Sequence, residues 1–371
     1  MSGLVRENIG VGIIGTGFGG KIHVPGFRSA SSARIVGIAG ADPHRTEMIA
    51  REMGIGKAHR SWEALLDDEN IHAVSIATPP GVHHQIVLDA VKRGKHVLCE
   101  KPFGMNPQQA NDMWTAATKA GVVHMVDFIF RMSPELNRLK ELLEAGSIGR
   151  IFHVNIEWTL PGRVTRDPRW CWQVDRSAGG GSLFAFGSHV VDYIEWLFGS
   201  VQAVSAGLSV CKPIVVEGLP SKVSAEDTFT VMVKLQEGPV VMVSVSTATP
   251  GGRGHWISVY GEKGTLVVEN SNLRDVVMGT RLYRIGLDGK QMLESHASAW
   301  QSAETACEDG RLALFSRMAA AFISAVHSGQ RQHPTFRDGW RAHVLMEAIR
   351  LSNESRQWVE IADPGSLQQV S

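Results

Sequence analysis

Glu100, Lys101 and Pro102 directly follow a short apolar segment, residues 96–99, which is typical of a β-strand. In an open parallel sheet, ligands bind beyond the carboxyl ends of the strands, so Lys101 is a candidate to exchange a proton with a bound substrate. The proline after it disfavours helical geometry at Lys101. The alternative is a solvated surface lysine, as most lysines at strand ends are.

A glycine-rich turn is the second chemical signal. The strand expected at residues 8–14 leads into a G-x-G-x-x-G sequence formed by Gly15, Thr16, Gly17, Phe18, Gly19 and Gly20. In this pattern the first glycine allows a tight turn, the second lets the backbone approach a pyrophosphate, and the third lets the next helix pack closely on the strand. The six residues are therefore predicted to bind a dinucleotide, and the alternative is a glycine turn without a ligand.

The end of the next strand, residues 34–39, bears on which dinucleotide is expected. A carboxylate about 20 residues beyond the glycines usually binds the adenosine ribose, but Gly40 and Ala41 stand there. Without that acid a 2′-phosphate is admissible, and Arg45 or His44 could pair with it. Asp42 lies only two residues further on, where a shift in register would restore an acid of the NAD type. NAD and NADP both stay open, with a slight preference for NADP.

The first 127 residues otherwise alternate between strands and helices, with helices expected at 46–53, 62–66 and 82–93 and an apolar strand at 72–77. This order predicts a parallel sheet. Thr78 and Pro79 end the strand beside the one that leads to Lys101, so they should face a bound nicotinamide. His83 opens the next helix, where its ring either contacts a ribose or is exposed. Glu100 is interpreted as a cofactor or inter-strand partner, or equally as an ordinary surface glutamate.

Aromatic and charged residues gather ahead of three consecutive glycines at 179–181. They are Trp158, Arg163, Arg166, Trp170, Trp172, Asp175 and Arg176. Polyols bind by stacking on indole rings and by hydrogen bonds to planar side chains, so Arg163 and Trp172 are the substrate candidates of this loop. Arg131 is expected to pair with a carboxylate, and the alternative is a role in the site. Arg253 and His255 are expected to be solvated loop residues, and the alternative is that they reach the site from the edge of the sheet.

Further along the chain, residues 228–235 and 240–245 are predicted to be antiparallel strands, and residues 311–327 and 338–353 to be amphipathic helices. Composition then excludes several classes of function. The 37 basic side chains balance the 37 acidic ones, which argues against nucleic acid or an anionic membrane as the main partner.

The four cysteines, at positions 99, 171, 211 and 307, are far apart, so neither a zinc site nor a disulfide framework is indicated and no metal is expected. No apolar run approaches the roughly 18 residues that span a bilayer, and the N-terminus lacks an apolar signal core. We therefore expect a soluble, cytoplasmic protein.

Taken in order, these motifs resemble those of the glucose-fructose oxidoreductase, inositol dehydrogenase and MocA (Gfo/Idh/MocA) family. The glycine turn, Thr78-Pro79-Pro80 with His83, residues 94–97 and Glu100-Lys101-Pro102 carry the resemblance in the first half. In the second half it rests on residues 128–131 with Pro134, Gly149, the three glycines with Gly187, His189 and Asp192, and residues 334–339.

The resemblance implies an α/β fold with a Rossmann domain over residues 1–127. It also implies a C-terminal α/β domain over residues 128–371, built on a large, mostly antiparallel sheet, which would bind substrate and form a homodimer or homotetramer. The implied reaction is NAD(P)-dependent hydride transfer at a carbinol or carbonyl group of a sugar, cyclitol or related polyol.

Within that family pattern, Lys101 and His189 would flank the reacting oxygen. Asp192 is a third candidate to bind substrate, after Arg163 and Trp172. Many members have an aspartate one helical turn before the histidine, where this chain has Ala185. An alanine can neither orient nor charge the imidazole, so Lys101 would carry more of the proton transfer. Two alternatives stay open: an enzyme that cleaves glycosides through transient NAD-dependent oxidation, and a dinucleotide-binding sensor without turnover.

Overall fold

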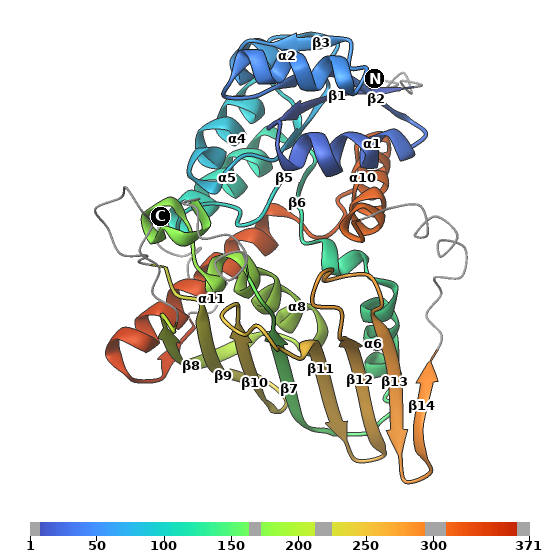
Figure 1. Cartoon of the computed structure of the whole chain (residues 1–371), viewed down its shortest axis with the longest axis vertical. Coiled ribbons are helices and arrows are strands. Elements are labelled where there is room, and N and C mark those ends of the chain that lie inside the picture. The colour runs from blue at the N-terminus through green and yellow to red at the C-terminus, as the bar shows by residue number, and fades with distance from the viewer. Residues whose placement is uncertain (1–7, 163–171, 212–224, 294–308, 362–371) are drawn as a thin grey trace. The chain divides into compact units, whose positions relative to one another are not determined.

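The computed structural model describes residues 8–162, 172–211, 225–293 and 309–361 (Figure 1). The chain divides into two compact units. The first comprises Met1–Met132 and Cys307–His343, and the second comprises Ser133–Ala306 and Val344–Ser371. The predicted domain boundary after residue 127 lies close to the first of these breaks, whereas residues 307–343 return to the first unit.

The first unit is built on a six-stranded sheet in the order β3-β2-β1-β4-β5-β6. Its strands are β1 (Ile9–Ile14), β2 (Ala33–Ala39), β3 (Lys57–His59), β4 (Ala73–Ile76), β5 (His96–Cys99) and β6 (His124–Val126). All neighbouring pairs are parallel. The residues of β1 and β4 are buried throughout, as expected for parallel strands covered on both faces. The strand order reverses at β1 and β4, which is where ligands bind in sheets of this type.

The helices of this unit include the four predicted at residues 46–53, 62–66, 82–93 and 311–327. The helices are α1 (Val24–Ser29), α2 (Pro43–Glu52), α3 (Trp62–Leu66), α4 (His83–Lys92), α5 (Pro107–Ala120) and α10 (Arg311–Ser328). A π-helix, η1 (Gly19–His23), precedes α1. Although α10 lies late in the sequence, it packs on α1 through Phe315 and Phe322, whose rings meet Phe27 edge-on at 5.8 and 6.3 Å between centroids. This apolar contact explains why residues 307–343 belong to the first unit.

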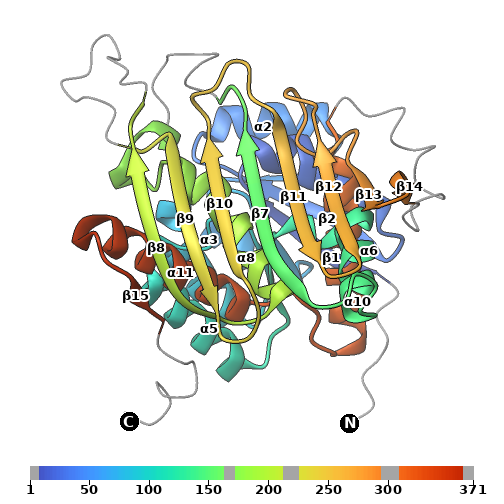
Figure 2. The ribbon, with the colours of Figure 1, turned by 90° about the horizontal axis from the view of Figure 1, so that it is seen from below.

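The second unit is built on a nine-stranded sheet in the order β14-β13-β12-β11-β7-β10-β9-β8-β15 (Figure 2). Its strands are β7 (Ile151–Thr159), β8 (Val201–Ser209), β9 (Thr228–Leu235), β10 (Val240–Ser246), β11 (Gly254–Gly261), β12 (Gly264–Asn270), β13 (Arg281–Gly286), β14 (Gly289–Leu293) and β15 (Val359–Glu360). All pairs are antiparallel except β7 with β10. The expectation of a mostly antiparallel sheet is therefore confirmed.

One face of this sheet is covered by α6 (Pro134–Glu144), α8 (Ser188–Phe198) and the end of α11 (Phe336–Ser355). The other face is open: burial alternates along β9, with Met232 41% exposed. Such alternation is typical of an antiparallel sheet that is buried on one side. Within the described ranges, no helix combines the length and apolar character needed to cross a membrane.

Candidate active site

The glycine turn joins β1 to η1, and its geometry distinguishes its glycines. Gly15 has a φ of +120°, and an added Cβ would lie 2.4 Å from the carbonyl oxygen of Ala77, so only glycine fits there. Around Gly17, by contrast, no atom of the described residues lies within 4 Å of an added Cβ. Gly19 and Gly20 are buried against Ile13 and Ile49. Thus Gly17 faces the open space that a pyrophosphate would need.

Thr16 and Phe18 complete the turn. An added Cβ on Gly40, at the end of β2, would lie 2.6 Å from Thr16 Cγ2. A side chain at position 40 would require the side chains of Thr16 and Thr46 to move, which is a steric reason for a glycine in place of the usual ribose-binding acid. The ring of Phe18 meets His23 edge-on at 5.5 Å, and the Arg311 guanidinium lies 4.9 Å from its centroid.

Asp42 acts as the N-cap of α2. Its Oδ1 accepts hydrogen bonds from the backbone N–H groups of His44 at 3.0 Å and Arg45 at 3.2 Å. This geometry fully accounts for an aspartate at the start of a helix. Arg45 is exposed on the first turn of α2. A ribose or phosphate contact by either residue stays a prediction.

His83 joins the loop after β4 to the loop after Lys101. It is fully buried, with Nε2 at 2.8 Å from the Thr78 carbonyl oxygen and Nδ1 at 3.1 Å from the Pro102 carbonyl oxygen. Burial lowers the pKa of its imidazole. The alternative of an exposed histidine is therefore wrong, and a ribose contact is not needed to explain its presence. Thr78 Oγ1, beside Pro79, is buried without a hydrogen-bond partner among the described residues.

Lys101 lies one residue beyond Glu100 at the carboxyl end of β5, as the sequence predicts. Its side chain is half-buried, and its backbone N–H donates to Glu100 Oε2 at 3.1 Å. Loss of water around the ammonium group lowers the pKa of Lys101, and Arg311 adds to this effect, while Glu100 and Asp127 oppose it. A lowered pKa increases the fraction of neutral amine, which is the form that can accept a proton from a hydroxyl group.

Glu100 is the centre of a buried polar network and not a surface residue, so that alternative is wrong. Its side-chain Oε1 lies 3.2 Å from His23 Nε2, and His23 Nδ1 lies 2.8 Å from Ser75 Oγ. The His23 ring is fully buried and stacks on Phe315 at 4.0 Å. The carboxyl group of Asp127 completes the cluster: one side-chain atom each from His23, Glu100 and Asp127 lies within 4.8 Å of the others.

The two carboxyl groups of this network have opposite pKa shifts. Burial alone raises the pKa of Glu100, but hydrogen bonds from His23 and Asp127 and the interaction with Lys101 lower it below its usual value. Burial, the charge of Glu100 and the hydrogen bond to Glu100 all raise the pKa of Asp127 well above its usual range. These opposite directions favour an ionised Glu100 beside a protonated Asp127.

Sequence reasoning missed His23, Ser75 and Asp127. For Asp127 a signal existed, because it directly follows β6 and so stands at the same sheet edge as Lys101. For His23 and Ser75 no local pattern indicated the contact, since they are 52 residues apart and His23 is 77 residues from Glu100.

His189 and Asp192 lie on α8 in the second unit, and both are 5% exposed. The segment before them, Leu183–Gly187, is a π-helix and not an α-helix. The predicted spacing of one α-helical turn between Ala185 and His189 is therefore wrong, because a π-turn is wider than an α-turn. Ala185 still offers no group that could charge or orient an imidazole.

The three consecutive glycines lead into this helix, and Glu226 fixes the turn. Its Oε1 accepts from the Leu183 N–H at 3.0 Å, and its backbone oxygen accepts from the Ser182 N–H at 2.8 Å. Gly181 has a φ of +113°, and an added Cβ would lie 2.2 Å from Glu226 Oε1. A glycine at 181 and a glutamate at 226 together set the start of the helix that carries His189.

His255 lies within β11 and not in a solvated loop, so that expectation is wrong. It is buried, its Nε2 lies 3.0 Å from the Tyr193 hydroxyl group, and its ring stacks on Trp158 at 4.1 Å. Burial lowers its pKa to about 3. Trp158 itself is buried in β7, outside the predicted loop. Arg253 is exposed and pairs with Glu157 at 3.3 Å, whereas Arg131 pairs with Asp338 at 3.0 Å as expected.

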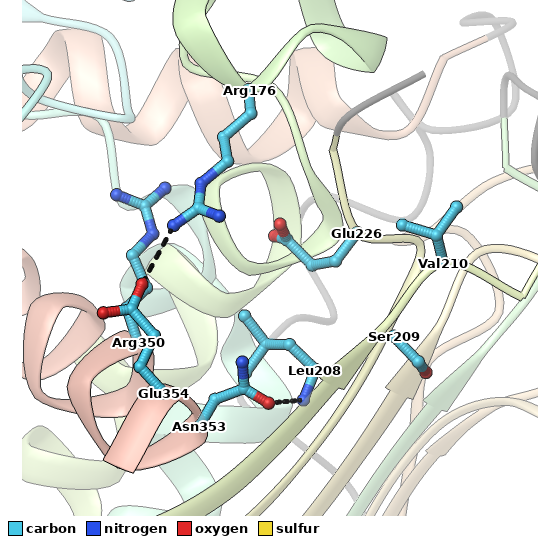
Figure 3. A pocket seen from close by; sticks show the side chains of 8 residues that line it. All are labelled: Arg176, Leu208, Ser209, Val210, Glu226, Arg350, Asn353 and Glu354. Atoms are coloured by element: carbon cyan, nitrogen blue, oxygen red, sulfur yellow. Dashed lines mark hydrogen bonds and ion pairs between the residues drawn. The ribbon is translucent and has the colours of Figure 1, made fainter. Parts of the chain in front are cut away.

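A pocket of the second unit includes Arg176, one of the loop residues, in its lining (Figure 3). Its lining residues are Arg176, Leu208, Ser209, Val210, Glu226, Arg350, Asn353 and Glu354. Arg176 pairs with Glu354 at 3.4 Å, so the lining holds charges of both signs. Trp172 is half-buried in a short 3₁₀-helix, Trp172–Val174. Arg163 lies outside the described residues, as do Arg166 and Trp170.

Comparison with known proteins identifies the family. Residues 9–128 match the model of an oxidoreductase family with an NAD-binding Rossmann fold, and residues 140–361 match the C-terminal α/β domain of the same family. The chain belongs to the Gfo/Idh/MocA family. It is an oxidoreductase with an NAD-binding Rossmann domain.

Several known proteins are similar to this chain over both of its domains. An uncharacterized oxidoreductase of Synechocystis sp. is 31% identical, covering 96% of this chain and 97% of that protein. The levoglucosan dehydrogenase of Pseudarthrobacter phenanthrenivorans is 28% identical, covering 96% and 98%. The solved structure of a levoglucosan dehydrogenase in complex with NADH and levoglucosan superposes with a TM-score of 0.86 at 27% identity, covering 96% of this chain and 100% of that one.

The residues of the Gfo/Idh/MocA glycine turn fit a dinucleotide. Gly17 leaves open space above the backbone, and Thr78 holds a buried hydroxyl oxygen without a partner among the described residues. Buried polar groups are normally hydrogen-bonded, so an orphan at the end of β4 is consistent with a ligand that supplies the bond.

Replacing Gly17 by alanine tests the open space. Because none of the described residues has an atom within 4 Å of the new methyl group, and the φ of Gly17 is not positive, the unfolding free energy should change by no more than about 0.5 kcal/mol. The dissociation constant for NADH, measured by fluorescence titration, should rise about tenfold or more, because the methyl group occupies the approach of the pyrophosphate. Gly15→Ala is the contrast: it should destabilise the protein without cofactor, by about 1–3 kcal/mol. Unchanged NADH binding by Gly17→Ala would contradict the assignment.

Proposed function

We propose that this chain oxidises a secondary alcohol, or reduces the corresponding ketone, on a cyclic polyol such as a sugar, anhydrosugar or cyclitol. The observation that carries the proposal is Lys101, an amine of lowered pKa at the carboxyl end of β5, on the same sheet edge as the glycine turn. Bound NAD(P) supplies the hydride acceptor or donor. The relatives named as a levoglucosan dehydrogenase, a myo-inositol 2-dehydrogenase of Thermotoga maritima and a D-apiose dehydrogenase of Paraburkholderia graminis support the substrate class.

Lys101 is the proposed proton acceptor in the oxidation direction. The neutral amine takes the proton of the substrate hydroxyl group as the hydride leaves the carbon that bears this hydroxyl group. In the reduction direction the ammonium returns the proton to the oxygen. His189 is proposed as the second catalytic residue and Asp192 as a substrate-binding residue, both on α8. Arg163 and Trp172 stay substrate candidates of the loop that precedes the three glycines.

Cofactor preference is proposed to favour NADP slightly. Gly40 supplies no carboxylate at the end of β2, and the Asp42 carboxylate caps α2. At this strand end no carboxylate is therefore positioned to bind the ribose hydroxyl groups and repel a 2′-phosphate. Arg45 is exposed on the first turn of α2 and could pair with such a phosphate. The remaining cofactor contacts are proposed for Thr16, Phe18, Pro79 and His83, in keeping with the glycine turn and the loop after β4.

We also propose that residues 1–127 bind the cofactor and that residues 128–371 bind substrate and form a cytoplasmic homodimer or homotetramer. The open sheet face supports association, because Met232, Met242 and Met292 are each more than two-fifths exposed and large exposed apolar patches mark interaction sites. Light scattering should give a molar mass in solution of two or four chains, and Met242→Lys with Met232→Lys should lower it. A monomeric wild type would refute this part.

A panel of anhydrosugars, cyclitols and keto-sugars with both cofactors tests the reaction. We expect a change in nicotinamide absorbance with at least one substrate, and Lys101→Ala should lower kcat by about 100- to 10,000-fold because a positioned acid–base group contributes this much. NADH binding should be retained. Lys92→Ala, at an exposed lysine on α4, is the control and should match the wild type. Product formation without net nicotinamide change would instead favour glycoside cleavage.

Arg45→Ala tests the cofactor preference. Loss of a charge-assisted hydrogen bond should raise the dissociation constant for NADPH about tenfold and leave that for NADH within about twofold. Arg51→Ala removes an exposed arginine from the last turn of the same helix and should affect neither. Equal loss of both cofactors in Arg45→Ala would show that Arg45 does not read the 2′-phosphate.

A further inference from the structure

We propose that Glu100 is a positioning residue that places one fixed negative charge beside Lys101, and that Asp127 serves it as a neutral hydrogen-bond donor and not as a second charge. The inference rests on the proposed role of Lys101 as the proton-exchanging group. It assigns a task to a buried network that the hydride transfer itself does not require.

The contacts of Glu100 fix its carboxylate in place. Oε1 lies 3.2 Å from His23 Nε2, and Oε2 accepts from the backbone N–H of Lys101 at 3.1 Å. His23 is in turn held by Ser75 at 2.8 Å and by stacking on Phe315. Glu100 is 8% exposed and His23 is fully buried, so the carboxylate has little freedom to turn toward water.

Asp127 approaches the same carboxylate from the end of β6. Its backbone N–H donates to the Cys99 carbonyl oxygen at 2.8 Å, which ties it to β5, and its side chain is within the 4.8 Å cluster with Glu100 and His23. It is 2% exposed. Two carboxylates buried this close do not both ionise, because their repulsion is not screened by water. One proton is therefore retained, and Asp127 holds it while Glu100 accepts the hydrogen bond.

The other charged or titratable groups that interact with this cluster leave Glu100 as its dominant anion. Arg311, on α10, adds positive charge near Lys101 and is paired with Asp309 at 2.7 Å, where Lys21 also lies at 3.1 Å. Burial keeps the Cys99 thiol protonated and the His83 ring neutral. His23 faces Glu100 directly. The protonation of Lys101 thus depends on a balance between burial and Arg311 on one side and the negative charge of the Glu100–Asp127 pair on the other.

Removing the charge of Glu100 should shift this balance in a known direction. In Glu100→Gln the ammonium form of Lys101 loses its stabilising partner, so its pKa falls. Alcohol oxidation requires the neutral amine, and the rising limb of kcat/KM against pH should move to lower pH by about 1 unit. The amide oxygen of glutamine can still accept from the Lys101 N–H, which limits structural loss.

Asp127→Asn is the matched control. An asparagine keeps the size, and its amide N–H group replaces the O–H donor of a protonated aspartate, so the limb should stay within about 0.3 units of the wild type. If Asp127 held the charge instead, the two variants would exchange their results: Asp127→Asn would move the limb and Glu100→Gln would not. That outcome, or no movement in either variant, overturns the proposal.

Two readouts do not depend on turnover. The pH dependence of the reaction of Lys101 with an amine-specific acylating reagent, followed by peptide mass spectrometry, should show the same downward shift in Glu100→Gln. The infrared band of a protonated carboxyl group should be present in the wild type at neutral pH and absent from Asp127→Asn, which tests the assignment even if Glu100→Gln does not fold.

Correct shifts without activity on any polyol would refute the proposed function alone. Activity that depends on Lys101 without these shifts would refute this inference alone.

Discussion

The carboxylate of Glu100 is the contact on which the cofactor-binding edge of the first unit depends. It joins the helix that follows β1, through His23, to the ends of β5 and β6, and His23 extends the contact to Ser75 on β4. Parallel strands all end at one edge, so each loop there brings its polar groups into the same region. A buried carboxylate costs free energy unless it is hydrogen-bonded. Three neighbouring loops are therefore constrained together, and Lys101 is held as part of that constraint.

Much of the first unit could be predicted from local sequence. The apolar runs that form β1, β2, β4 and β5 lie within one or two residues of their predicted limits, because a strand buried on both faces needs consecutive apolar side chains. The glycine turn could also be predicted, since a positive φ at Gly15 requires glycine. The partners of Glu100 could not be predicted, because the residues next to His23 and Asp127 in sequence do not indicate a contact with a residue far along the chain.

Prediction failed in the second unit where long-range packing decided the outcome. His255 follows a Gly-Gly-Arg-Gly sequence, which is typical of a loop, yet its strand pairs with β7 and its ring stacks on Trp158. Burial came from the partner strand and not from the local pattern. The π-turn before His189 was equally hidden: Glu226 accepts from the Leu183 N–H across 43 residues, and this contact sets the helix start. Family resemblance supplied the architecture of this half, whereas local sequence did not supply its register.

The opposed effects on Lys101 explain how one lysine can serve a reversible reaction. Burial and Arg311 favour the neutral amine needed to accept a hydroxyl proton, while the charge of Glu100 favours the ammonium needed to return it. A solvated lysine would stay protonated at neutral pH, and a buried lysine without a nearby anion would stay neutral. Two ionised carboxylates would again favour the ammonium. A single shared proton between Glu100 and Asp127 thus leaves Lys101 between these limits, which is the condition under which a general base is also an effective general acid.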